Sequence, residues 1–155
     1  ISQGSQPLVS YHYGREDHVG CRKLLRYALT TVCVAAPLLF LGLYVFAPQI
    51  VSAYLSHASA ELVDYSVRAF RRYSVSYLLV GFNVVIGGFL TALERPVPAI
   101  SISVGRGLVL QSAVLLTLAA VFGGDALWYT PILSEAMCLA MSLFFLRRYR
   151  REHRG

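Results

Sequence analysis

Long apolar runs separated by short polar segments dominate the chain. Two of these runs have no Asp, Glu, Lys or Arg, and two others hold a single charged residue each, Arg106 and Glu135. A helix needs about 20 residues to cross the hydrocarbon of a bilayer, because each residue adds about 1.5 Å. Transmembrane β-strands would instead alternate in polarity over about 10 residues, which these runs do not. The pattern therefore predicts an all-α membrane protein with spans at 28–47, 73–93, 99–122 and 127–146.

The remaining segments predict shorter elements. Residues 1–13 have a helical polarity pattern but are too short to span, so we interpret them as a truncated helix whose first half lies upstream. The chain also opens on Ile1 and not on Met. Segment 59–72 is amphipathic, with Ser59 as an N-cap, which predicts a helix along the membrane interface or a plain amphipathic connector. Residues 147–155 form a basic tail.

Composition supports the membrane class. The 155 residues are 56% hydrophobic and 14% charged, whereas a soluble domain carries about 25% charged residues. The net charge of +6 does not indicate nucleic-acid binding, because the charges separate apolar runs and do not form one basic face. Cys21, Cys33 and Cys138 lack paired spacing, so we interpret them as small hydrophobic residues and expect no metal site.

The distribution of Lys and Arg predicts the orientation. The connection before the first span, the connection before the third span and the tail would lie on one side and hold ten Lys and Arg residues. The opposite side holds three, Arg68, Arg71 and Arg72. Cytoplasmic segments are enriched in these residues, so we expect the C-terminus in the cytoplasm. The basic tail suits contact with anionic lipid headgroups.

Polar residues in the first helix share one face. Gln3, Gln6, Ser10 and Tyr13 recur at helical spacing. Pro7 cannot donate a backbone hydrogen bond, which frees a carbonyl near Gln3. We interpret this face as the lining of a cavity, and the alternative is that the glutamines hold helices together.

Three further polar residues lie inside predicted spans. Asn83 sits near the middle of its helix and serves either helix packing or a water-filled cleft. Arg106 must reach a carboxylate, backbone carbonyls or the headgroups. Glu135 has the opposite charge, but a direct pair requires the two helices to be offset. Glu135 either faces a cavity and takes up protons or lies in the wet outer interface.

Three stretches of the chain carry recognisable motifs. They are "SQPLVSYHYG" followed by "REDHVGCRKLLRYAL", then "GFNVVIGGFLTALERPVPAISISVGRG", and then "FGGDALWYTPILSEAM". Together these motifs resemble the MATE family, the multidrug and toxic compound extrusion transporters. The first resembles the family's eighth helix and the loop after it, the second resembles the tenth and eleventh helices with their short proline-bearing turn, and the third resembles the entry to the twelfth. The resemblance covers essentially the whole chain.

This resemblance implies a twelve-helix transporter of two six-helix lobes, of which the chain holds part of the C-terminal lobe. Family members export cationic and amphipathic drugs in exchange for H⁺ or Na⁺ by alternating access. The implied partners are xenobiotics, the coupling ion, membrane lipids and an N-terminal lobe of the same polypeptide, with no cofactor. The implied location is the bacterial plasma membrane.

The chain departs from the family pattern at several positions. His12 stands where asparagine is usual, and Arg15 stands where alanine is usual. The span 73–93 lacks the carboxylate that some members use as a cation site. Coupling must then use the N-terminal lobe or Glu135, with Arg106 as its candidate partner. This resembles the DinF-like and Mep-type bacterial branches more than the NorM-type branch.

We therefore hypothesise a secondary multidrug exporter. Its substrate cleft would be lined by amides and phenols at Gln3, Gln6, Tyr11, Tyr13 and Asn83. The first rival is a lipid-linked saccharide flippase of the same superfamily, which needs several inward arginines. The second is a membrane scaffold without transport activity, which needs a cleft packed shut. A membrane enzyme is disfavoured, because the sequence has no Walker loop, HExxH or GxSxG motif.

Overall fold

The computed structural model describes residues 1–56, 58–94 and 96–152, and in this part of the chain the regular structure is helical. Arg95 and Arg154, two of the ten cations counted above, lie outside the described residues. The elements in chain order are α1 (Ser2–Gly14), α2 (His18–Val45), α3 (Ala47–Tyr54), α4 (Ala60–Ser74), α5 (Tyr77–Ala92), α6 (Pro96–Val104), the π-helix η1 (Gly105–Leu110), α7 (Gln111–Phe122), the 3₁₀-helix η2 (Gly124–Tyr129) and α8 (Thr130–Glu152).

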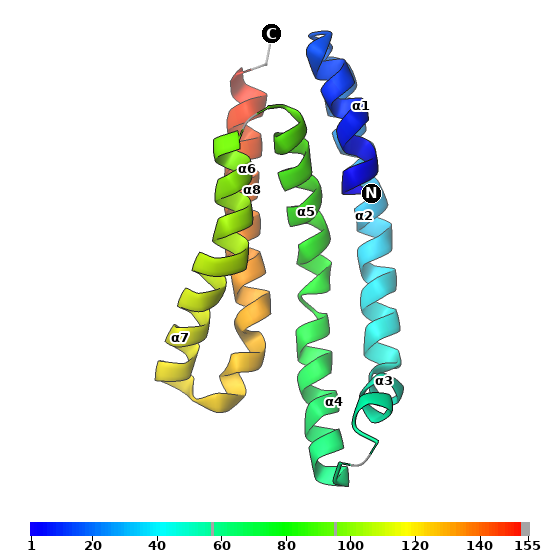
Figure 1. The fold of residues 1–155 in the computed structure, drawn as a ribbon, viewed down its shortest axis with the longest axis vertical. Coiled ribbons are helices and arrows are strands. Elements are labelled where there is room, and N and C mark those ends of the chain that lie inside the picture. The colour runs from blue at the N-terminus through cyan, green and yellow to red at the C-terminus, as the bar shows by residue number, and fades with distance from the viewer. Residues whose placement is uncertain (57, 95, 153–155) are drawn as a thin grey trace.

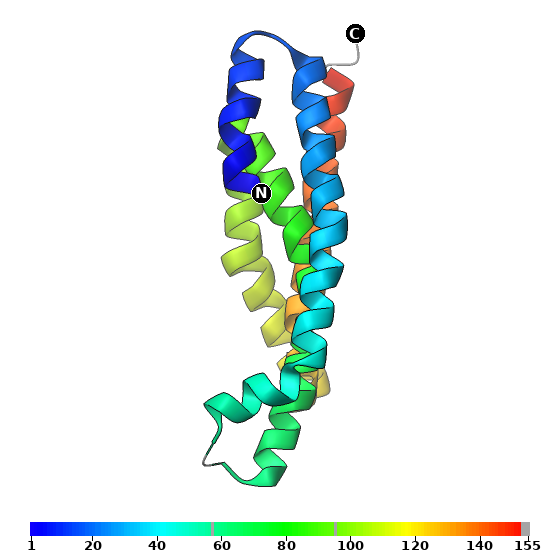
Figure 2. The same ribbon diagram turned by 90° about the vertical axis from the view of Figure 1, so that its right-hand side faces the viewer.

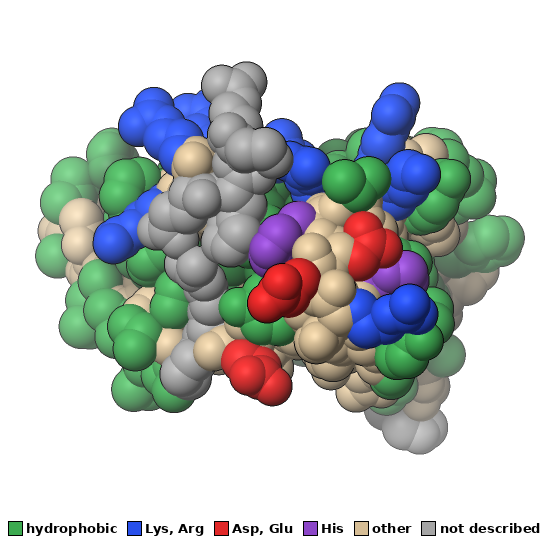
Figure 3. Space-filling model, turned by 90° about the horizontal axis from the view of Figure 1, so that it is seen from above, with side chains coloured by type: hydrophobic (Ala, Val, Ile, Leu, Met, Phe, Trp, Pro, Cys, Tyr) green, Lys and Arg blue, Asp and Glu red, His purple; other side chains and the backbone are tan. Residues whose placement is uncertain are grey.

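Within the described residues, four helical segments are long and apolar enough to cross a membrane, as the hydrophobic pattern predicts. They are His18–Val45, Ala60–Ala92, Val97–Phe122 and Ala126–Arg151. The α1–α2 turn, the α5–α6 connection and the C-terminal end lie at one end of the bundle (Figures 1 and 2). These are the three segments that the Lys and Arg pattern assigns to one side. Figure 3 looks onto this end, where Lys and Arg side chains stand beside Asp, Glu and His side chains.

The turn between α1 and α2 is stabilised by the side chain of Asp17. Its carboxylate caps α2 by accepting a 2.8 Å hydrogen bond from the backbone N–H of Gly20, and it lies 2.8 Å from His12 Nδ1. Two hydrogen bonds hold the pKa of Asp17 below its usual value. The bond from the backbone of Gly20 has the larger effect, and the bond to His12 has the next largest. Glu16 adopts a positive φ of 58°, which lets the chain reverse within a few residues.

The helix expected at 59–72 forms as α4, capped by Ser59 as predicted, but it continues into α5 without a break. Val75 and Ser76 keep right-handed helical torsions, and i→i−3 hydrogen bonds carry the backbone through the junction. Consequently α4 extends along the direction of α5 and does not turn across it (Figure 1). Its position at a membrane interface stays a prediction.

Helix α5 is the centre of the bundle, with α1 and α2 on one side and α6, α7 and α8 on the other (Figure 1). Small residues let its neighbours approach closely. A methyl group at Gly81 would lie 2.8 Å from Val32 of α2, and one at Gly88 would overlap Ser2 Oγ and lie 2.9 Å from Gln6 Nε2 of α1. The backbone of α5 therefore touches side chains of both helices.

Two hydrogen bonds bind α1 to α5. Ser2 Oγ donates to the carbonyl of Val84 and Ser10 Oγ donates to that of Ala92, each at 3.1 Å. The two donor serines are eight residues apart in α1, and the two acceptor carbonyls are eight residues apart in α5. The two helices therefore run parallel in matched register. Gly88 lies midway between the two bonded carbonyls. This arrangement gives part of the polar face of α1 a role in helix packing.

A larger side chain at Gly88 should weaken this contact. We expect Gly88→Val in the full-length protein to lower stability by about 1–3 kcal/mol, because the α1 side chains must be displaced. Gly42→Val is the matched control, since a Cβ at Gly42 meets nothing within 4 Å. Thermal unfolding in detergent, followed by intrinsic fluorescence, measures both. Equal melting temperatures for the two variants would contradict the close packing.

Candidate functional site

A polar cluster joins α5, η1 and α8 inside the bundle. The amide nitrogen of Asn83 donates to Glu135 Oε2 at 2.7 Å and to the Glu135 carbonyl at 3.0 Å. Ser142 Oγ donates to the amide oxygen of Asn83 at 3.2 Å. Arg106 Nε lies 4.0 Å from Glu135 Oε1. One carboxylate thus has a hydrogen-bond donor from one neighbouring helix and a cation from another.

The cluster is largely shielded from its surroundings. Asn83 is 1% exposed and Ser142 is fully buried, while the side chain of Glu135 is 12% exposed and that of Arg106 is 35% exposed. A charge in an apolar bundle costs several kcal/mol unless it is paired and hydrogen-bonded. Glu135 is therefore shielded within the bundle, and its position relative to the outer membrane interface stays a prediction.

Arg106 contacts Glu135 from the π-helix η1. A π-turn holds one more residue than an α-turn, so it shifts the side chains before and after it relative to each other. Gly105 begins this segment, and a methyl group there would lie 2.9 Å from Cε of Met141 on α8. The widened turn and the close approach at Gly105 together bring the guanidinium to α8.

Small and polar residues continue the buried face of α8. Cys138 lies one turn after Glu135, is fully buried and directs its Sγ at the carbonyl of Ile102, 3.8 Å away. Ser142 lies seven residues after Glu135, a spacing that returns to the same helix face. The sequence interpretation missed Ser142, although this spacing from Glu135 could have identified it.

The predicted cleft residues of α1 have mixed exposure. Gln3 and Tyr11 are exposed, whereas Gln6 and Tyr13 are partly buried. The nitrogen of Gln6 faces Gly88 on α5, and Tyr13 packs against the apolar core. The alternative in which glutamines hold helices together therefore fits Gln6 better than it fits Gln3.

The structure separates Asn83 from these α1 residues. Residues 83 and 88 are about 140° apart around α5, since each residue turns an α-helix by about 100°. Gly88 faces α1, whereas Asn83 faces α8, where Glu135 and Ser142 satisfy its amide. The prediction that Asn83 shares one cleft surface with the α1 residues does not hold in this conformation. The buried amide forms its hydrogen bonds with α8, on a different face of α5.

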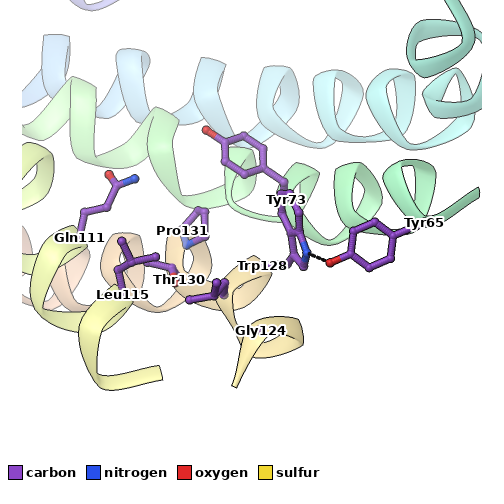
Figure 4. A pocket seen from close by; sticks show the side chains of 9 residues that line it. Tyr65, Tyr73, Gln111, Leu115, Gly124, Trp128, Thr130 and Pro131 are labelled. Atoms are coloured by element: carbon purple, nitrogen blue, oxygen red, sulfur yellow. Dashed lines mark hydrogen bonds between the residues drawn. The ribbon is translucent and has the colours of Figure 1, made fainter. Parts of the chain in front are cut away.

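A cavity of about 670 Å³ lies between α4, α7, η2 and the start of α8 (Figure 4). Tyr65, Tyr73 and Trp128 supply its aromatic wall, and Trp128 Nε1 donates to the Tyr65 hydroxyl at 2.8 Å. Gln111 and Pro131 line it nearer the middle of the bundle. Pro131 lies one turn before Glu135, so the cavity reaches towards the polar cluster.

Thr130 connects this cavity with the start of α8. The residue lines the cavity and is 2% exposed, and its hydroxyl has no hydrogen-bond partner. A buried hydroxyl without a partner costs about 1–3 kcal/mol, so a water molecule or an ion in the cavity would lower this cost. The sequence interpretation assigned no role to Thr130 or Gln111.

The fold and the polar cluster together define a class of protein. Apolar spanning helices enclose a paired carboxylate, an arrangement typical of membrane proteins that move ions or solutes. Among the described residues no group of three or more His, Cys, Asp and Glu could hold a metal ion.

The model of the MatE family matches residues 1–117, and the chain belongs to this family. It is a membrane transporter of the MATE superfamily, and members of the family are transporters and not enzymes. No curated protein and no solved structure matches the chain. The match runs from α1 into α7 and includes Asn83 and Arg106, whereas Glu135 lies beyond it.

The hydrogen bonds of the cluster should make Asn83 and Glu135 energetically dependent on each other. We expect Asn83→Leu to lower stability by about 1–3 kcal/mol, because the buried carboxylate loses its donor. Glu135→Gln in the same chain should restore part of this loss, since a neutral amide costs less to bury than a carboxylate.

The measurement is a double-mutant cycle on melting curves of the full-length protein in detergent, with the exposed Gln49→Ala as control. We expect a coupling energy between 83 and 135 of about 0.5–3 kcal/mol, and none between 49 and 135. Additive effects at 83 and 135 would refute the contact.

Proposed function

We propose that this transporter is a secondary exporter that couples the outward movement of amphipathic, cationic organic compounds to the inward movement of H⁺ or Na⁺. The observation that carries the proposal is the Glu135 carboxylate, which is nearly buried and bonded to two other helices in a chain of the MatE family. A group at such a position can bind a cation in one state and lose it in another.

Cation binding at Glu135 would change the contacts between helices. A bound proton removes the negative charge that Arg106 faces and converts one carboxylate oxygen into a donor. Arg106 is the described charged group facing Glu135 from η1, and the facing group from α5 is the uncharged amide of Asn83. Loss of the carboxylate charge therefore weakens one ionic contact and rearranges the hydrogen bonds between α5 and α8.

The cavity lined by Trp128, Gln111 and Thr130 supports a route to this carboxylate. Its lining residues lie on α4, α7, η2 and the start of α8, towards the end of the bundle opposite the basic end. Under the orientation predicted from Lys and Arg, this end faces outward. An inward-moving cation would enter there and meet Glu135 one turn beyond Pro131.

The α1 face supports a substrate surface. Tyr11 presents an exposed ring, and the guanidinium carbon of Arg15 lies 5.5 Å from its centre. Arg15 also donates to the Tyr11 hydroxyl at 2.9 Å. The ring thus contacts the guanidinium of Arg15, and we propose that the same kind of cation–π contact would bind a cationic drug. We propose Gln3, Gln6, Tyr11 and Tyr13 as the lining, completed by an N-terminal lobe, and we propose Asn83 as a residue that positions Glu135.

Two finer assignments are part of the proposal. The described part of α5 carries no carboxylate, which favours the DinF-like and Mep-type branches over the NorM-type branch. The basic end favours a cytoplasmic C-terminus in a bacterial plasma membrane. The flippase alternative calls for several inward arginines, whereas Arg106 is neutralised by Glu135.

Transport by the full-length protein in proteoliposomes tests the coupling role. With an imposed H⁺ or Na⁺ gradient, we expect Glu135→Gln to reduce ethidium export at least about tenfold, because a neutral amide binds no proton at neutral pH. Ethidium binding, measured by fluorescence polarisation, should change little. The exposed Glu61→Gln is the control. Gradient-driven export that persists in Glu135→Gln would reject this carboxylate as the coupling group.

The α1 residues need a separate measurement. Gln6→Ala and Tyr11→Ala should weaken ethidium binding, each by up to about tenfold, because they remove an amide and a π-face from the proposed surface. Ser112→Ala, at an exposed position on α7, is the control. Unchanged binding in both α1 variants would reject the proposed lining, and export of lipid-linked saccharide in place of ethidium would favour the flippase.

A further inference from the structure

A second cavity lies at the basic end of the bundle, between α2 and α8. Its volume is about 520 Å³, and its described lining consists of Arg22, Arg26, Leu29, Thr30 and Cys33 of α2 with Arg150 of α8. Three guanidinium groups from two helices thus border one space. No acidic residue occurs among these lining residues.

The lining changes from cationic to apolar along α2. Arg22 and Arg26 are one turn apart at the end of the bundle. Cys33 lies eleven residues after Arg22, or about 16 Å at the helical rise. Thr30 directs its hydroxyl to the carbonyl of Arg26 and so adds little polarity. The cavity is therefore polar at one end and apolar towards the middle of the bundle.

The apolar part continues beyond the cavity. Val34, Leu38 and Leu41 follow Thr30 at helical spacing on α2, and they are 60%, 65% and 54% exposed. The helix therefore presents one stripe that begins with arginine and ends with aliphatic side chains. An amphipathic molecule with an anionic head and a long hydrocarbon chain matches this stripe.

We propose that the cleft between α2 and α8 is a binding site for an anionic phospholipid. The phosphate would lie among Arg22, Arg26 and Arg150, and one acyl chain would follow Leu29, Cys33 and the aliphatic stripe. Arginine suits this role, because its planar guanidinium binds phosphate oxygens in pairs. Basic pockets between transmembrane helices are known to hold such headgroups.

Such a lipid would also stabilise the bundle. A phosphate bound between the guanidinium groups of α2 and α8 would attract both helices. The site is independent of Glu135 and of cation coupling. It requires only that the α2 stripe lies in the lipid bilayer.

Native mass spectrometry of the full-length protein tests the site, with cardiolipin, phosphatidylglycerol and phosphatidylcholine added in detergent. We expect the anionic lipids to remain bound at least about tenfold more strongly than phosphatidylcholine, since each nearby Arg contributes about 1 kcal/mol. The triple variant Arg22→Gln, Arg26→Gln, Arg150→Gln should lose this preference. The charge-matched control is Lys23→Gln, Arg147→Gln, Arg151→Gln, at exposed positions of the same end.

A second variant separates the acyl part from the headgroup part. Cys33→Trp keeps every charge and fills the apolar section of the cleft, so it should weaken cardiolipin binding about tenfold while gel filtration shows a folded protein. Equal losses in the two triple variants would overturn the proposal in favour of general surface charge. Thermal protection by inorganic phosphate as strong as that by cardiolipin would overturn it in favour of a small-anion site.

Discussion

The carboxylate of Glu135 is the constraint on which much of the bundle depends. A charge among apolar helices is tolerated only with partners, and its partners come from both neighbouring segments: the amide of Asn83 on α5 and the guanidinium of Arg106 on η1. The contacts of this one group join α5, η1 and α8, and Arg106 reaches it from the π-helical segment. A residue that is costly to bury thereby specifies how three segments meet, and it is also the group best suited to bind a cation.

The centre of the bundle depends on small residues as much as on the polar cluster. Gly81 and Gly88 let α2 and α1 approach the backbone of α5, and Gly105 lets η1 approach α8. Ser2 and Ser10 donate to carbonyls of α5, and the buried Ser142 donates to Asn83, so close helices exchange hydrogen bonds where larger side chains would have kept them apart. The two sides of α5 consequently have different proposed roles. One side packs against α1, which carries the proposed substrate surface, and the other side holds the proposed coupling site.

The two ends of the molecule differ in chemistry in a way that suits a transporter of the MatE family. One end is rich in arginine and includes the cleft between α2 and α8, whereas the other has an aromatic cavity bordered by Trp128. The arginines at one end attract the anionic headgroups of a membrane leaflet. At the other end, the aromatic cavity has polar groups such as Gln111 and can admit an ion or water. The proposed lipid site and the proposed ion route thus occupy opposite ends and involve different residues.

The amino-acid sequence by itself determined the class of this protein, the four long apolar helices, the ends at which the basic connections lie and the cap at Ser59. These features follow from local composition and periodicity, because a bilayer-length apolar run can satisfy its backbone only as a helix. Only the tertiary structure decided which polar groups meet. The sequence placed Asn83, Arg106 and Glu135 in three spans, but their contact depends on the rotation of α5, on the π-turn at η1 and on the contact of Gly105 with α8. It also decided that α4 leads into α5, since the helical torsions at Val75 and Ser76 carry no signal in the hydrophobic pattern.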